Sequence, residues 1–94
     1  MATVDGPNAR TWILRAIDIH RARRAKDTTS AVVARELAIS LVQLFNASWE
    51  TDQPEAMRAF AESYEILRDL FARGALEARY HALVAELAGI LDPA

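Results

Sequence analysis

Residues 31–49, AVVARELAISLVQLFNASW, decide the fold of this chain. Apolar side chains recur there at helical spacing on one stripe, and a second apolar stripe runs beside the first. The first stripe consists of Val33, Leu37, Leu41, Leu44 and Ser48, and the second of Ala31, Ala38, Val42, Phe45 and Trp49. N-cap residues over 27–30 predict a helix over residues 29–49. A helix that is apolar on two faces either lies at the centre of a fold or binds a partner.

Three more amphipathic helices are predicted around this one, over residues 7–25, 53–73 and 75–91. In the 53–73 helix an inward seam is predicted at alternating spacings of three and four residues, comprising Met57, Phe60, Tyr64, Leu67 and Phe71. Four helices with short connections predict an all-α fold, an antiparallel up-down four-helix bundle that forms a single domain over residues 1–94.

Two local signals set the boundaries of the third helix. Asp52, followed three residues later by Glu55, resembles a capping box. Gly74 coincides with a jump in the phase of the apolar residues, which favours a helix end with a left-handed residue there. One continuous helix over residues 54–91 with a stutter is the alternative.

The composition excludes much chemistry. The chain of 94 residues is 52% apolar and 26% charged and holds no cysteine. Without cysteine, a disulfide framework, a thiolate zinc site and a cysteine nucleophile are excluded. There is no glycine-rich phosphate loop and no Gly-x-Ser-x-Gly turn. Glu77 and His81 share a helix face, which is more typical of a surface pair than of metal ligands. We therefore expect no enzyme, no cofactor and no metal.

The sequence also bears on location. No run of about 18 apolar residues is present, and residues 1–27 contain no apolar segment of a secretory signal. We therefore expect a cytoplasmic protein without a membrane partner.

Charge is divided unevenly along the chain. Residues 1–27 carry six basic and three acidic side chains, a net charge of +3, whereas residues 28–94 carry a net charge of −5. A solvated basic helix is the plain interpretation of the first segment. The chain is acidic as a whole, which disfavours nucleic acid as a partner. A dimeric helical regulator or a nucleic-acid-associated protein that uses the basic first helix remains the alternative function.

Several stretches carry a family resemblance, and they span residues 13–91 loosely. They are Ala16-Ile17, Ala38-Ile39 with Leu41-Val42 and Phe45, Ala47-Ser48-Trp49-Glu50 with Asp52, and Tyr64-Glu65-Ile66-Leu67 with Phe71. In these stretches the chain resembles the flagellin-specific export chaperones of the FliS type, although Gln53-Pro54 replaces that family's paired glycines. The resemblance implies a helical bundle that covers sticky helical ends of a partner protein and delays their assembly.

Both lines of reasoning predict a protein-binding surface. The 29–49 helix, and the flank of the 53–73 helix, carry more apolar residues than one seam needs, and surplus apolar surface marks a partner site. The candidate partner-binding residues lie off the seams: Val32, Ile39, Val42, Trp49, Ile66 and Leu70. The expected partner is an amphipathic helical segment captured in a groove, with a flagellin-like helix as the candidate. Self-association as a homodimer and a core that buries the whole surplus are the alternatives.

Overall fold

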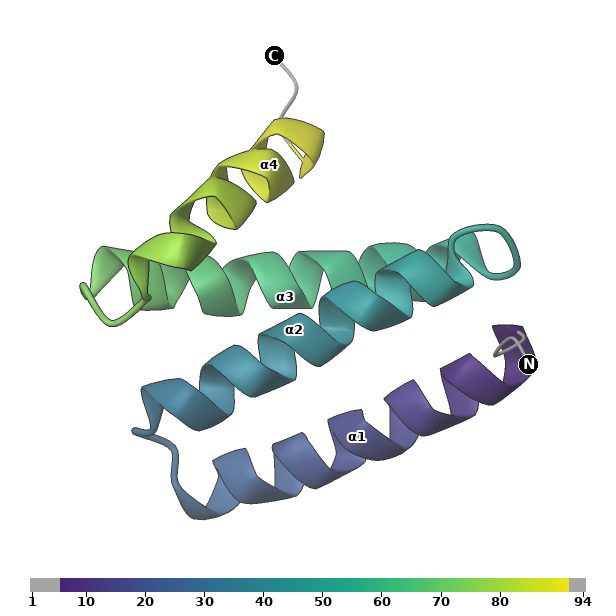
Figure 1. Cartoon of the computed structure of the whole chain (residues 1–94), viewed down its shortest axis with the longest axis horizontal. Helices are drawn as coiled ribbons and strands as arrows, with labels where there is room; N and C mark the ends of the chain where they lie inside the picture. The colour runs from purple at the N-terminus through teal and green to yellow at the C-terminus, as the bar shows by residue number, and fades with distance from the viewer. Residues whose placement is uncertain (1–5, 92–94) are drawn as a thin grey trace.

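The computed structural model describes residues 6–91, which form four α-helices (Figure 1). They are α1 (Gly6–Lys26), α2 (Ala31–Ser48), α3 (Gln53–Ala72) and α4 (His81–Leu91), and a 3-10 turn, η1 (Ala78–Tyr80), precedes α4. Successive helices run in alternating directions. The predicted all-α four-helix bundle is thus confirmed, while the two ends of the predicted domain, residues 1–5 and 92–94, lie outside the described residues.

The helices pack in chain order. Within residues 6–91, close backbone contacts join α1 to α2, α2 to α3 and α3 to α4, and they join no other pair of α-helices. Helix α2 is therefore central, as its two apolar stripes predict, and α1 is an edge helix. The bundle is open, because α1 does not close against α4.

Helix α4 covers only part of its neighbour. It begins at His81 rather than at residue 75, because the turn η1 takes up residues 78–80. Since the length of a helix is proportional to its number of residues, α4 is much shorter than α3. Figure 1 shows α4 starting beside the C-terminal end of α3 and rising away from it. The N-terminal half of α3 therefore lacks a fourth helix over it.

Side-chain caps begin two of the helices. The Ser30 hydroxyl accepts a hydrogen bond from the Val33 backbone N–H at 3.2 Å, and the Asp52 carboxylate accepts one from the Glu55 N–H at 3.1 Å. The Glu55 side chain does not complete a capping box, because the Asp52 N–H donates to the Ser48 carbonyl at 2.8 Å. The Glu55 carboxylate is therefore free to reach another helix.

The chain breaks after α3 at Gly74, as the phase jump predicts. Gly74 has a φ of +68°, its N–H donates to the Phe71 carbonyl at 3.0 Å, and the Ala75 N–H donates to the Leu70 carbonyl at 2.8 Å. These two bonds form a Schellman motif, in which a glycine takes the left-handed conformation without steric penalty. The alternative of one continuous helix over residues 54–91 is excluded.

Replacing Gly74 by alanine is expected to lower the free energy of unfolding by about 1–2 kcal/mol, the cost of a left-handed conformation for an L-residue. No atom would contact the new Cβ, so the cost is conformational rather than steric. Gly89, inside α4, is the matched control, because a Cβ there also meets no atom and its helical backbone suits alanine. Gly89→Ala is expected to raise stability by about 0.5–1 kcal/mol. Urea unfolding measures both, and a shift of the same sign in the two variants would contradict this explanation.

The inward face of α3 includes a stripe that the predicted seam leaves out. It begins with short side chains and ends with longer ones, and all its members are buried: Ala56, Ala59, Ser63, Ile66 and Leu70. Alanine and serine let α2 approach on this side, so α3 turns this stripe as well as Phe60 and Leu67 toward the core. The seam residues Met57 and Phe71 consequently stay 38% and 47% exposed.

Helix α1 contributes less to the core than α2 or α3. Ile17 is its one fully buried apolar side chain among the described residues, and Ile13 and Leu14 pack partly against the core. Side-chain ion pairs therefore matter more for holding α1 than for holding the other helices.

Helix α2 is the one helix among the described residues that is long and apolar enough to cross a membrane by length and composition. The central helix of a bundle meets the same criterion, and α2 packs between α1 and α3.

Candidate interaction surface

An apolar surface lies where the C-terminal half of α2 meets the N-terminal half and the middle of α3. We call it the α2–α3 patch and define it as Val42, Phe45, Trp49, Met57 and Tyr64. Trp49 is 44% exposed, and Val42, Phe45 and Tyr64 are half-buried against the core. On α2 the members are spaced by three and four residues, which places them on one flank of the helix. The patch is the part of the α2–α3 pair that α4 leaves uncovered.

A run of aromatic rings supports Trp49 from the core outwards. Phe60 is fully buried, and its ring meets Phe45 edge to face with the centroids 4.7 Å apart. Phe45 in turn contacts Trp49 at 5.6 Å with a tilted geometry. Edge-on and tilted contacts are the favoured arrangements of aromatic pairs. The exposed indole is therefore held in place by packing and offers a rigid apolar anchor.

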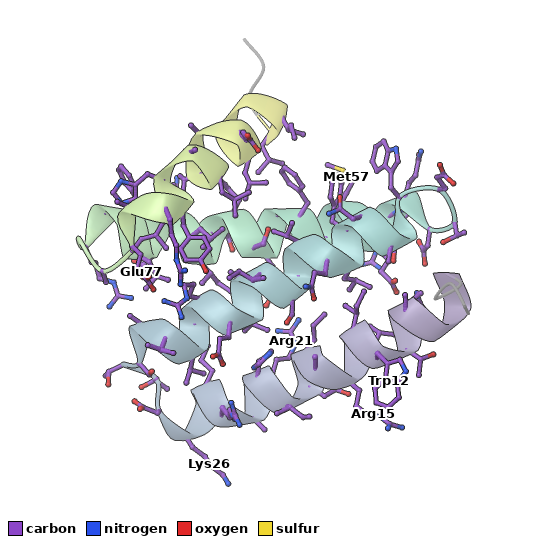
Figure 2. The ribbon with its side chains drawn as sticks, in the orientation of Figure 1. Trp12, Arg15, Arg21, Lys26, Met57 and Glu77 are labelled. Carbon is purple, nitrogen blue, oxygen red and sulfur yellow. The ribbon has the colours of Figure 1, made fainter. Side chains whose placement is uncertain are left out.

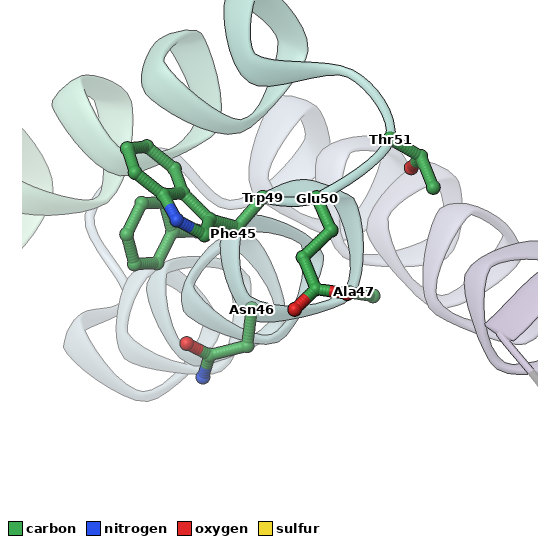
Figure 3. Close-up of a pocket in the computed structure, with 6 residues that line it drawn as sticks. All are labelled: Phe45, Asn46, Ala47, Trp49, Glu50 and Thr51. Carbon is green, nitrogen blue, oxygen red and sulfur yellow. The ribbon is translucent and has the colours of Figure 1, made fainter.

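A shallow hollow borders this indole (Figure 3). It is lined by Phe45, Asn46, Ala47, Trp49, Glu50 and Thr51, and the view shows the Trp49 ring beside that of Phe45. Three of these residues, Asn46, Glu50 and Thr51, are polar, so the hollow combines apolar rings with hydrogen-bonding groups. The hollow belongs to the end of α2 and the turn that follows, so it extends the α2–α3 patch.

The structure separates the six predicted partner-binding residues. Trp49 and Val42 lie in the α2–α3 patch. Val32 is 52% exposed and Ile39 is half-buried, both on the side of α2 turned away from the core. Ile66 and Leu70 are buried at 6% and 0% exposure, which corrects their predicted place at a surface. Their apolar surface is core, because α3 turns its stripe of small residues inward.

Two residues of this surface, Met57 and Phe45, are not among the predicted partner-binding residues. Both fit regular apolar stripes, and such a stripe looks the same in sequence whether or not a neighbour covers it. The stripe of Ala56, Ala59 and Ser63 is the signal that could have found them, since short side chains on one flank mark the close approach of a helix.

Ion pairs between residues far apart in the chain join α1 to α3, two helices whose backbones do not touch. Arg10 of α1 donates from Nε to Glu55 Oε1 of α3 at 2.9 Å and from Nη2 to the second oxygen, and the Ser48 hydroxyl of α2 donates to Oε1 at 2.9 Å. Arg21 of α1 forms a similar bidentate ion pair with Glu62 of α3, with N···O distances of 2.6 and 2.9 Å. These pairs tie α1 to α3 across the groove floored by α2.

The Glu55 carboxylate is the most connected acid of this group. Its pKa is lowered below the ordinary value of a glutamate, mainly by the hydrogen bonds from Arg10, whereas burial opposes the shift. The hydrogen bond to Glu55 likewise raises the pKa of Arg10. The pair is thus charged over the whole neutral range, and its role is to connect the helices.

Glu77 and His81 do not converge on a common point. Glu77 pairs with Arg35 and with Arg79, while His81 Nε2 lies 3.0 Å from the Leu76 carbonyl. Within residues 6–91 no group of three or more His, Cys, Asp or Glu side chains gathers in a way that could hold a metal ion.

No family model, no curated protein and no solved structure matches this chain.

Proposed function

We propose that this protein is a small helical binding protein that holds an amphipathic helical segment of a partner on the α2–α3 patch. The observation that carries the proposal is the rigidly supported, 44% exposed Trp49 next to the uncovered half of α3. Tryptophan in a well-packed setting is the residue type that most often dominates binding energy at interfaces. The resemblance to flagellin export chaperones supports the same class of function.

The shape of the uncovered region favours a helix as the occupant. Helix α3 is nine residues longer than α4, which corresponds to about 14 Å or two to three helical turns. The flank of α2 and the flank of α3 form two antiparallel ridges there, and a third helix with apolar side chains at i, i+3 or i+4, and i+7 fits between such ridges. Binding of this kind would cover an apolar helical segment of the partner and so delay the partner's assembly.

A labelled peptide covering a terminal amphipathic helix of flagellin tests the proposal by fluorescence anisotropy. Trp49→Ala is expected to weaken binding by at least about tenfold, because a central tryptophan typically contributes about 2 kcal/mol or more. Trp12→Ala is the matched control, since Trp12 is 64% exposed on α1, away from the patch, and its loss should leave peptide binding unchanged.

Two outcomes would overturn parts of the proposal. Equal affinity of the wild type and Trp49→Ala would remove the patch as the binding site, and no binding by the wild type would remove flagellin as the partner. Light scattering tests the competing function: a dimer that dissociates in Trp49→Ala would assign the patch to self-association instead.

A further inference from the structure

Helix α1 carries an exposed stripe on the side turned away from α2. We call it the outer stripe of α1 and define it as Trp12, Arg15, Ile19, Ala22 and Lys26. The spacing alternates between three and four residues, so these side chains lie on one helix face, and each of them is exposed. Figure 2 shows Trp12, Arg15 and Lys26 projecting away from the other helices, whereas Arg21 points inward. Trp12 and Ile19 are 64% and 51% exposed.

The outer stripe is cationic as well as apolar. Arg15 lies over the Trp12 ring, 5.2 Å from its centroid, and among the described residues neither Arg15 nor Lys26 has an acidic partner. Asp18 is the one acid of α1, and its charge acts on Arg21, which already pairs with Glu62. Among the described residues, no ion pair therefore neutralises Arg15 or Lys26, although Asp18 and Asp27 are nearby in the chain.

The pairing of charges decides which occupant fits. A second copy that pairs α1 with α1 would bring another basic helix against this one, and like charges repel. A nucleic acid would match the cations through its phosphates but would leave Trp12 and Ile19 in water. An anionic bilayer surface offers phosphates directly above hydrocarbon, so one planar surface satisfies both kinds of side chain. Tryptophan also favours that interface, because its ring is apolar and its N–H polar.

We infer that α1 binds the surface of an anionic lipid bilayer through its outer stripe, lying in the plane of the interface. The stripe from Trp12 to Lys26 extends over about 21 Å of helix, and α1 is an edge helix, so no other described element obstructs it. Trp12 and Ile19 enter the boundary between headgroups and acyl chains, while Arg15 and Lys26 reach the phosphates with their long side chains. This binding is separate from the proposed function, which uses the opposite part of the bundle.

Vesicle sedimentation with the whole chain tests the inference. Vesicles of phosphatidylcholine with one quarter phosphatidylglycerol are compared with vesicles of phosphatidylcholine alone, at low and at high salt. The wild type should bind the anionic vesicles only, and binding should fall as salt rises. Arg15→Gln combined with Lys26→Gln is expected to weaken binding by about twentyfold to thirtyfold, since each cation near an anionic surface contributes about 1 kcal/mol. Trp12→Ala should weaken it by about tenfold or more.

Matched variants separate this inference from the proposed function. In Trp49→Phe the remaining tryptophan is Trp12, whose emission should shift to the blue on anionic vesicles. Trp49→Ala should bind vesicles like the wild type and lose the helical peptide, and Trp12→Ala should do the reverse. Trp12 is 64% exposed and Trp49 is 44% exposed, so neither is a core residue, and circular dichroism should show an unchanged fold in Trp12→Ala and in Trp49→Ala.

Four results would overturn the inference. They are no binding to anionic vesicles, equal binding to neutral vesicles, full binding by Trp12→Ala, and a dimer in light scattering that Trp12→Ala dissociates. Salt-dependent binding to duplex DNA that Trp12→Ala leaves unchanged, without vesicle binding, would assign the basic helix to nucleic acid instead.

Discussion

Replacing Phe60 by alanine is expected to lower the free energy of unfolding by about 3–5 kcal/mol, the range for removing a buried phenylalanine. The ring is fully buried on α3, contacts Phe45 at 4.7 Å and lies in the same core cluster as Leu41 and Leu67. Truncation would remove this contact and leave a cavity that helices of fixed spacing cannot fill. Since domains of this size typically have only about 5–15 kcal/mol of total stability, the variant should unfold at a much lower urea concentration.

Phe71→Ala is the matched control for this prediction. Phe71 belongs to the same helix and to the same predicted seam, but it is 47% exposed and its ring contact is with His81. Its truncation should cost no more than about 1 kcal/mol, because much of the ring is already in water. Equal urea midpoints for the two variants would mean that Phe60 is not central to the core.

Phe60 and Phe71 also show how far the sequence predicts this fold. Local signals are sufficient to predict the number of helices, the Asp52 cap and the break at Gly74, because each of these depends on residues within one or two helical turns. The rotation of α3 is not predictable in the same way. Apolar spacing identifies a stripe on α3, but packing decides which stripe a neighbouring helix covers. Here short side chains such as Ala59 let α2 pack on the flank of α3 that the predicted seam leaves out.

The candidate surface is predicted in part for the same reason. Trp49 and Val42 are recognised because α2 has more apolar residues than one neighbour can cover, and this surplus is visible in sequence. Ile66 and Leu70 are predicted at the surface because their spacing differs from that of Phe60 and Leu67. The gap over the N-terminal half of α3 depends on the shortness of α4, which the turn η1 determines and apolar spacing over residues 75–91 does not reveal.

The ion pairs between α1 and α3 are beyond sequence reasoning altogether. Arg10 and Glu55 are far apart in the chain, and surface arginines and glutamates give no signal of their partners. These pairs matter here because α1 has little buried apolar surface. Their contribution can be measured by a change at the best-connected carboxylate.

Replacing Glu55 by glutamine is expected to lower the free energy of unfolding at pH 7 by about 1–2 kcal/mol. This lies between the roughly 0.2–1 kcal/mol of an exposed ion pair and the roughly 1.5–3 kcal/mol of hydrogen bonds to a charged group. The change keeps the size of the side chain but removes the charge that Arg10 and the Ser48 hydroxyl bind. Glu65→Gln is the matched control, because Glu65 is exposed on the same helix and forms no ion pair among the described residues. That change should stay within about 0.5 kcal/mol of the wild type.

The same variant predicts how stability depends on pH. The hydrogen bonds from Arg10 lower the pKa of Glu55 in the folded protein, so protons bind the unfolded chain more tightly than the folded one at this site. The stabilisation is therefore complete above the unfolded pKa of about 4.3 and is lost as the pH falls through the lower folded pKa. Urea unfolding from pH 7 to pH 3 should show the gap between the wild type and Glu55→Gln closing below about pH 4. A gap that stays constant over this range would mean that the Arg10–Glu55 pair does not hold α1 through its charge.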